Sequence, residues 1–129
     1  MKIAAITEDG VTISRHFGRA PYYAVLTVEE GRIVNRELRD KLGHRDFAGQ
    51  HEDVSGRHGY GPGAQDRHAR MAAAIADCEV LLCGGMGWGA YEAMRAYGIK
   101  PIVTDIVDIE AAVQAYLDGT IVDHTELLH

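Results

Sequence analysis

The first forty residues alternate between short apolar runs and turn-forming polar groups, a pattern that is typical of β-strands. Lys2–Thr7 is apolar at most positions, which predicts a central strand that is covered on both faces. Tyr22–Val28 is rich in aromatic and β-branched residues, and the turn Glu29-Glu30-Gly31 leads into Arg32–Leu38 as its hairpin partner. Val11–Arg15 fits either a short strand or an extended loop. This part of the chain is therefore expected to be mostly antiparallel β-structure.

The second half of the chain changes to a helical period that alternates with short apolar runs. We predict helices over Gln65–Ala76, from Gly87 or Gly89 to Tyr97, and from Asp108 to Gly119, with strands over Glu79–Cys83 and Ile99–Thr104. The residues expected to face the core are Met71, Ala72, Ile75, Ala76, Ala90, Ala93, Met94, Tyr97, Ile109, Ala112, Val113, Tyr116 and Leu117. Pro101 suggests an edge or a strand entry. The fold class is α/β, a mixed sheet flanked by helices in one domain of residues 1–129.

A long segment without apolar periodicity, Asp40–Gln65, separates the two halves. It is rich in glycine and carries His44, His51 and His58. A loop of this length inside a compact domain is uncommon and is usually functional or mobile. His58 lies shortly before the predicted helix and has the best defined position of the three histidines.

Composition and charge narrow the classes of function. The chain has 129 residues and a formal net charge of −6, which argues against a nucleic-acid binder that works through bulk positive charge. No apolar stretch is long enough to span a bilayer, and the N-terminal run ends at Thr7-Glu8-Asp9, so we expect neither a signal peptide nor an anchor. Cys78 and Cys83 are too far apart along one predicted strand to form a disulfide. We therefore expect a reduced, cytoplasmic protein.

The first candidate site is the turn that reads C-G-G-M-G-W-G-A from Cys83 to Ala90. Gly84, Gly85 and Gly87 permit close approach of the backbone to a ligand, and the helix that follows offers N–H groups and a positive dipole end to an anion. The spacing Gly85-x-Gly87-x-x-Ala90 is a loose match to a dinucleotide fingerprint. The turn comes late in the chain, with one further strand after it, so a dinucleotide is a weaker prediction than another anion.

The second candidate site is the segment Ser14-Arg15-His16-Phe17-Gly18-Arg19-Ala20-Pro21. It places the imidazole of His16 between the guanidinium groups of Arg15 and Arg19. Imidazole can ligate a metal, and arginine can hold an anion through directed hydrogen bonds. A structural role for His16 beside an aromatic residue is about equally compatible with the sequence.

The remaining histidines give a weaker signal. His44, His51 and His58 are seven residues apart, which is not a zinc spacing, although spacing constrains little in a flexible loop. His68 shares a helical face with Met71 and Ile75, which favours a partly buried structural role. No role is predicted for His124 and His129. No motif supports catalysis, and Cys83 is either a soft metal ligand or, more commonly for such a residue, a buried small side chain.

Four blocks of the sequence together resemble the dinitrogenase iron–molybdenum cofactor biosynthesis domain family. His16-Phe17-Gly18-Arg19-Ala20-Pro21-Tyr22-Tyr23 is similar to the family block H-F-G-R-A-P-Y-F, and His58-Gly59-Tyr60-Gly61-Pro62 to its H-G-x-G-x segment. Gly84-Gly85-Met86-Gly87 with Ala90, followed by Gly98-Ile99-Lys100, resembles G-G-I-G-x-x-A…G-I-K. Asp108–Gly119 is similar to the closing helix of the family.

The resemblance implies a ribonuclease H-like α/β fold with a mixed five-stranded sheet flanked by helices. It also implies non-catalytic binding of an anionic metal–sulfur cluster, of the iron–sulfur or iron–molybdenum type, with His16 as a ligand. This sequence departs from many relatives in its longer histidine-bearing loop, and Trp88-Gly89 stands where many relatives have Pro-Arg.

We therefore expect a carrier or chaperone for a metal–sulfur cluster, with Arg15, His16, Arg19, Gly84, Gly85 and Gly87 in its binding site and His16, His44, His51 and His58 as metal ligands. Its partners would be cluster donor and acceptor proteins, without nucleic acid or membrane, and the chain would be a monomer or a homodimer. Two alternatives stay open: a nucleotide or phosphate binder that uses the Gly84–Gly89 turn, and a divalent-metal binder that uses the loop with His44, His51 and His58.

Overall fold

The structure of the protein, a computed structural model, describes residues 1–41 and 62–129, with the backbone alone described for 62–66. The strands are β1 (Lys2–Thr7), β2 (Tyr22–Glu29), β3 (Arg32–Asp40), β4 (Val80–Cys83) and β5 (Lys100–Val103). The helices are α3 (Pro62–Ala73), α4 (Trp88–Ala96), α5 (Ile109–Asp118) and the short 3₁₀ helix η1 (Thr125–Leu127). No helix in these ranges combines the length and the apolar character that crossing a lipid bilayer requires.

The strands form one mixed five-stranded sheet in the order β3-β2-β1-β4-β5. β1 lies in the middle, where Ala4 pairs with Val25 of antiparallel β2 on one side and with Leu81 of parallel β4 on the other. β2 and β3 form the predicted hairpin, with a register shift between Thr27 and Val28. β5 pairs in parallel with β4 and lies at an edge, which confirms the position suggested by Pro101.

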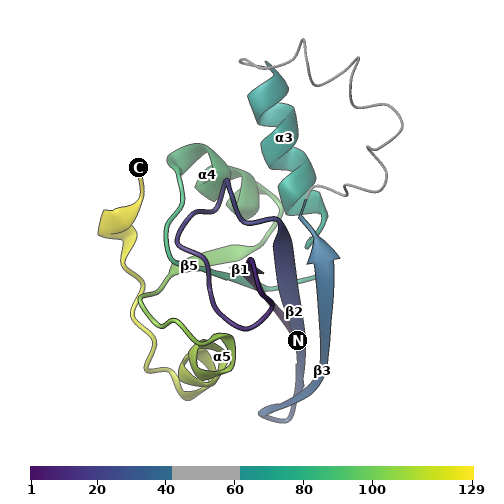
Figure 1. Ribbon diagram of the computed structural model, residues 1–129, viewed down its shortest axis with the longest axis vertical. Coiled ribbons are helices and arrows are strands. Elements are labelled where there is room, and N and C mark those ends of the chain that lie inside the picture. Colours follow the sequence, from purple (N-terminus) through teal and green to yellow (C-terminus); the bar gives the residue numbers. More distant parts are fainter. Residues whose placement is uncertain (42–61) are drawn as a thin grey trace.

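Helices cover both faces of the sheet (Figure 1). α3 and α4 pack against each other on one face, where the buried Tyr23 hydroxyl donates a hydrogen bond to the Met71 carbonyl at 2.8 Å. α5 lies on the other face, where Glu110 pairs with Arg36 of β3. Asp108 caps α5 by accepting a hydrogen bond from the Ala111 N–H at 2.8 Å, as its position in the sequence predicts.

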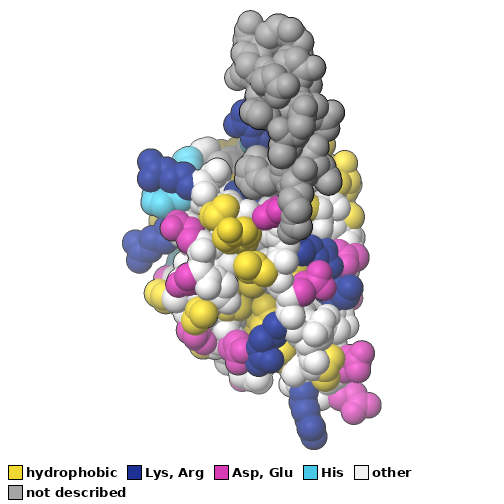
Figure 2. Space-filling view, turned by 45° about the vertical axis from the view of Figure 1, so that its right-hand side comes forward, with side chains coloured by type: hydrophobic (Ala, Val, Ile, Leu, Met, Phe, Trp, Pro, Cys, Tyr) yellow, Lys and Arg dark blue, Asp and Glu magenta, His cyan; other side chains and the backbone are white. Residues whose placement is uncertain are grey.

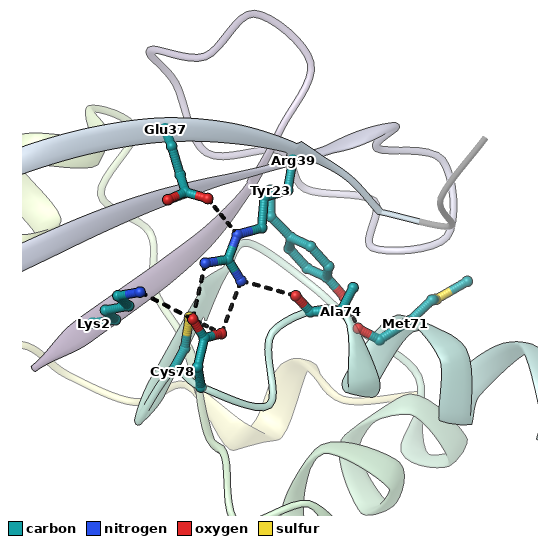
Figure 3. Close-up of polar contacts among 8 residues, drawn as sticks. Lys2, Tyr23, Glu37, Arg39, Met71, Ala74 and Cys78 are labelled. Atoms are coloured by element: carbon teal, nitrogen blue, oxygen red, sulfur yellow. Dashed lines mark hydrogen bonds and ion pairs between the residues drawn. The ribbon is translucent and has the colours of Figure 1, made fainter. Parts of the chain in front are cut away.

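A polar cluster ties the C-terminal end of α3 to the sheet (Figure 3). The Arg39 guanidinium donates hydrogen bonds to Glu37, to the Ala74 carbonyl at 2.9 Å and to both carboxylate oxygens of Asp77. Lys2 of β1 also contacts Asp77, at 3.1 Å. These contacts join the first strand, the third strand and the turn after α3, so they fix the direction in which α3 leaves the sheet.

The C-terminal segment runs from the edge of the sheet to the start of α4. The Asp123 carboxylate accepts a hydrogen bond from the Val103 N–H at 2.9 Å, and the His124 N–H donates to the Val103 carbonyl at 2.8 Å. The His129 N–H then donates to the Met86 carbonyl at 3.2 Å. The segment therefore lies along β5 and brings residue 129 to the turn that precedes α4.

Most predicted elements agree with the structure, and the differences are local. α3 begins at Pro62 rather than Gln65 and ends at Ala73, after which Ile75 stays buried while Ala76 is exposed. Tyr97 is also exposed rather than part of the core, because α4 has already ended at Ala96. Residues 11–15 form a loop with one isolated bridge, between Thr12 and Asp108. The finer assignment to a ribonuclease H-like fold and the single-domain organisation stay predictions.

Candidate functional site

The His16 segment is a tight turn between β1 and β2. The N–H groups of Arg19 and Ala20 both donate to the His16 carbonyl, at 3.1 and 3.0 Å, which closes the turn. Phe17 points into the core and is buried, whereas its neighbour His16 is exposed. Burial of the phenyl ring therefore fixes the turn and leaves the imidazole on the outside.

The buried Lys41 contacts this turn at Phe17. Its side chain is buried, the ammonium group donates to the Phe17 carbonyl, and the Nζ atom lies 4.3 Å from the centroid of the Phe17 ring. Burial lowers the pKa of Lys41 to about 8. Lys41 was not among the predicted site residues, because a lysine at the end of a strand reads as a solvated charge.

The glycine turn after β4 packs directly against the His16 segment. The Gly84 N–H donates to the Ser14 carbonyl at 2.9 Å, and a Cβ atom on Gly84 would lie 3.0 Å from the Arg15 Cα atom. A Cβ atom on Gly85 would lie 2.7 Å from the Arg15 carbonyl oxygen. These glycines therefore admit the chain's own backbone, which gives them a role that does not require a ligand at either position.

The His16 segment and the start of α4 enclose one open pocket of about 410 Å³. Figure 2 shows histidine side chains among Lys and Arg side chains along one side of the molecule. The residues that line the pocket come from three elements and the C-terminal segment, and they are Arg15, His16, Phe17, Gly18, Arg19, His68, Met86, Gly87, Trp88, Gly89, Ala90 and His129. The structure thus brings together four of the predicted site residues, namely Arg15, His16, Arg19 and Gly87.

The two other histidines of the pocket, His68 and His129, were not predicted as site residues. His68 lies on α3 and is half-buried, as its helical face indicates, but it borders the pocket rather than the core alone. Burial, and to a lesser degree the neighbouring Arg67, lowers the pKa of His68. A Cβ atom on Gly89 would lie 2.8 Å from the His68 Cε1 atom. No spacing in the sequence signals this contact, because the two residues come together only in the folded chain.

The N-terminus of α4 is partly engaged by the C-terminal segment. The Trp88 N–H donates to the His129 carbonyl oxygen at 3.2 Å, so the first N–H of the helix already has an acceptor. Gly89 and Ala90 lie in the first turn of the helix. Their N–H groups therefore have no carbonyl four residues earlier within the helix to which they could donate. The predicted anion-binding helix end therefore offers fewer N–H groups than the sequence suggests.

The three histidines of the predicted loop belong to the part of the chain that the structure does not describe. His44, His51 and His58 lie outside the described residues, and the segment from Pro62 to Gln65, predicted as part of the loop, is helical. Within residues 1–41 and 67–129, no three or more His, Cys, Asp or Glu side chains are arranged to hold a single metal ion. The pocket therefore does not present a complete mononuclear metal site built from described residues.

Comparison with known proteins identifies the family. A family model described as dinitrogenase iron-molybdenum cofactor matches residues 1–119. The chain belongs to this family. The match covers the His16 turn, the glycine turn and all three long helices, so both walls of the pocket are part of the family domain.

The individual proteins that this chain resembles are distant in sequence. An uncharacterized protein of Methanocaldococcus jannaschii is 24% identical over 119 residues, which cover 92% of this chain and 87% of that protein. The crystal structure of PH0822 superposes with a TM-score of 0.70 at 20% identity, over 98% of this chain and 99% of that one. The apo form of the orange protein from Desulfovibrio gigas gives a TM-score of 0.64 at 24% identity, over 95% and 91% of the two chains. These structures share the fold.

The family match ends at residue 119, before the C-terminal segment that reaches the pocket. His129 and its contacts with Met86 and Trp88 therefore lie outside the matched domain. At the other end of the segment, His124 lies near Glu126 and Asp105, at 2.9 and 3.7 Å, and away from the pocket. Asp105, which follows β5, is thus beside a histidine of the segment.

Both cysteines are buried in the core. Burial raises the pKa of the Cys83 thiol to about 12, and its Sγ atom lies 3.6 Å from the Ile102 carbonyl. Burial also raises the pKa of Cys78 to about 12. Because a thiol must lose its proton to ligate a metal, the buried-side-chain interpretation of Cys83 agrees with the structure better than the soft-ligand one.

Proposed function

We propose that this protein is a non-catalytic binding protein, a carrier or chaperone for an anionic metal–sulfur cluster of the iron–molybdenum or a related iron–sulfur type. The observation that carries the proposal is the meeting of His16, Arg15 and Arg19 with the start of α4 in one open pocket. The description of the matched family, which names the iron–molybdenum cofactor of dinitrogenase, supports the class of cargo.

The donor set of the pocket suits such a cargo. The exposed imidazole of His16 can bind a metal atom of the cluster through a ring nitrogen. The guanidinium groups of Arg15 and Arg19 can hold its negative charge through hydrogen bonds, and the dipole of α4 adds to the same potential. A volume of about 410 Å³ lies within the range of pockets that bind small molecules.

The exposure of the site fits transfer better than storage. Arg15, His16 and Arg19 are all exposed, so a preassembled cluster could enter and leave without unfolding of the chain. We propose donor and acceptor proteins of the cluster as the partners, and a ribonuclease H-like domain as the scaffold. The proposal assigns the chain no reaction of its own.

Anaerobic reconstitution tests the proposal. The full chain is incubated with ferrous iron and sulfide, with and without molybdate, and bound metal and sulfide are quantified beside the visible spectrum. We expect uptake by the wild type, a loss of at least about tenfold in affinity for His16→Ala, and no change for His124→Gln, whose imidazole lies outside the pocket. A wild-type chain that stays colourless, or a His16→Ala variant that binds equally well, would contradict the proposal.

Thermal unfolding with added nucleotides distinguishes the nucleotide-binding alternative from the proposed cluster binding. A nucleotide or phosphate bound to the Gly84–Gly89 turn at 100 times its Kd would stabilise the chain by about 2.7 kcal/mol. We expect no such stabilisation, because Gly84 and Gly85 are in contact with the Arg15 backbone and the Trp88 N–H is bonded to His129. The loop alternative, with His44, His51 and His58, stays a prediction.

A further inference from the structure

The pocket contains a second imidazole, that of His68, which comes from a different part of the chain. His16 lies in the turn between β1 and β2, and His68 lies on α3. Both residues line the same cavity, together with Gly87–Ala90 at the start of α4. Two histidines from separate elements thus border one space of about 410 Å³.

The ring of His68 lies in the space that a side chain at position 89 would fill. A Cβ atom at position 89 would lie 2.8 Å from Cε1 and 3.2 Å from Nδ1 of His68, distances that an ordinary side chain does not permit. Nε2 is the ring nitrogen farther from that position, at 3.9 Å. The missing side chain therefore leaves room for the imidazole ring to lie against the first turn of α4.

The polar atoms of this ring have no protein partner in the part of the chain that the structure describes. Neither ring nitrogen of His68 forms a hydrogen bond or an ion pair with another described residue. A half-buried imidazole gains stability from a partner for its nitrogen atoms, and a ligand in the pocket can provide one. The His16 ring likewise has no partner among the described residues, since the hydrogen bonds that His16 forms with them all involve its backbone atoms.

We propose that His68 is a second imidazole ligand of the cargo, so that one cluster is held between the His16 turn and α3. This inference rests on the proposed function. Two imidazoles from separate elements suit a cluster, which presents several metal atoms at different positions. A single ion needs its ligands to converge on one point, and no such convergence of three or more donors exists among the described residues.

The proposal also gives Gly89 a function in selectivity. A residue with a side chain at this position would displace the His68 ring and leave His16 as the sole imidazole of the pocket. Gly89 therefore acts as a positioning residue, and its effect on the cargo passes through His68. The chain would then hold its cluster by two nitrogen ligands and two guanidinium groups.

Pulsed electron paramagnetic resonance on the reconstituted full chain tests the inference, because it resolves the ¹⁴N couplings of coordinated imidazole. The cluster is assembled from ferrous and ferric iron with sulfide under anaerobic conditions, and dithionite then reduces it by one electron to a paramagnetic state. We expect couplings from two imidazoles in the wild type and from one in both His68→Ala and His16→Ala. His124→Gln, a histidine outside the pocket, should keep both couplings. Cluster affinity should fall at least about tenfold in His68→Ala.

Two further variants test the inference even if His68→Ala fails to fold. Gly89→Ala retains every histidine and should lose the His68 coupling, because the new Cβ atom must displace the ring. His68→Gln preserves a polar side chain if His68→Ala does not fold, and added free imidazole should restore the missing coupling in either variant. Unchanged couplings and affinity in the His68 variants would overturn this inference and leave the proposed function intact, whereas a wild-type chain without any cluster would overturn the proposed function itself.

Discussion

The backbone of Arg15 lies so close to Gly85 that a Cβ atom on the glycine would be 2.7 Å from the Arg15 carbonyl oxygen. Both groups belong to the main chain, so neither can rotate away. The contact joins the turn after β4 to the turn after β1, and it sets the distance between two walls of the pocket.

Gly85→Ala should therefore destabilise the chain and disturb the pocket. The added methyl group forces one backbone segment to move, and we expect a loss of about 2 kcal/mol in the free energy of unfolding. Gly18→Ala is the matched control, because a Cβ atom there meets nothing within 4 Å, and its effect should stay within about 0.5 kcal/mol. Urea unfolding of both variants measures the difference, and equal midpoints would show that the two turns are not rigidly packed.

Tyr23→Phe should cost about 1–2 kcal/mol of stability. The Tyr23 hydroxyl donates to the carbonyl of Met71 in the last turn of α3, and the substitution leaves that buried carbonyl without this donor. Tyr22→Phe, in the neighbouring position of the same strand but half-exposed, serves as the control and should change little. Chemical denaturation followed by circular dichroism compares the two. If the Tyr23→Phe and Tyr22→Phe proteins are equally stable, the hydrogen bond from the Tyr23 hydroxyl to Met71 does not stabilise the packing of α3 on the sheet.

Asp77→Asn should destabilise the chain at neutral pH by about 1 kcal/mol, since the pair with Arg39 is only partly shielded from solvent. The Arg39 guanidinium holds the pKa of the Asp77 carboxyl well below its ordinary value of 3.8. A carboxyl with a lowered folded-state pKa stabilises the fold above its ordinary pKa and loses that contribution as the pH falls below it. The stability difference between wild type and variant should thus be full at pH 7 and shrink on acidification below pH 3.8. A difference that is constant from pH 7 to pH 2 would contradict this assignment.

Lys41 predicts a dependence of stability on pH in the alkaline range. Burial lowers the pKa of Lys41 from 10.5 to about 8, so between these values the unfolded chain binds more protons than the folded chain. Stability should therefore rise with pH across this window, by about 2 kcal/mol relative to Lys41→Met, which keeps the volume without the charge. Urea midpoints of both proteins at pH 7 and pH 10 give the comparison. Parallel behaviour of the two proteins would show that the Lys41 ammonium is not desolvated.

The arginines of the pocket predict a dependence of cargo binding on salt. Arg15 and Arg19 are exposed, so their attraction to an anionic cluster is screened by added ions. Arg19→Gln should weaken cluster uptake at low ionic strength, and the difference from wild type should narrow as salt is raised. Arg95→Gln, on α4 but outside the pocket residues, is the control. If the Arg19→Gln and Arg95→Gln variants bind equally at every salt concentration, charge at the pocket contributes nothing.

Much of the fold could be predicted because its signals are local. The apolar run Lys2–Thr7 matches β1 in both bounds, and the Asp108 cap and the left-handed Gly119 define α5 as expected. The errors lie where tertiary contacts override the local pattern. Ala76 has the period of a core residue but follows the end of α3, whose last turn is fixed by Tyr23 and Arg39 from the sheet.

The candidate site was predicted in part for the same reason. Arg15, His16 and Arg19 are adjacent in the sequence, so their chemistry is visible there. His68 contributes through a contact with Gly89 on another helix, and no spacing rule relates two residues that meet only after the sheet has formed. The glycines at positions 84 and 85 were interpreted as room for a ligand, although they admit Arg15, because sequence alone does not say which backbone comes close.

The walls of the pocket come from segments that are distant in sequence: the turn at His16, α3 with His68, and the start of α4. The two turns are adjacent because β4 pairs with β1 in the middle of the sheet. Separation of these central strands would dismantle the cavity, so we expect that no short fragment of the chain binds the proposed cluster. Binding of the proposed cluster would then be thermodynamically linked to the cooperative unfolding of the sheet. The bound cluster would protect the amides of β1 and β4 against hydrogen exchange by the same free energy with which it stabilises the whole domain.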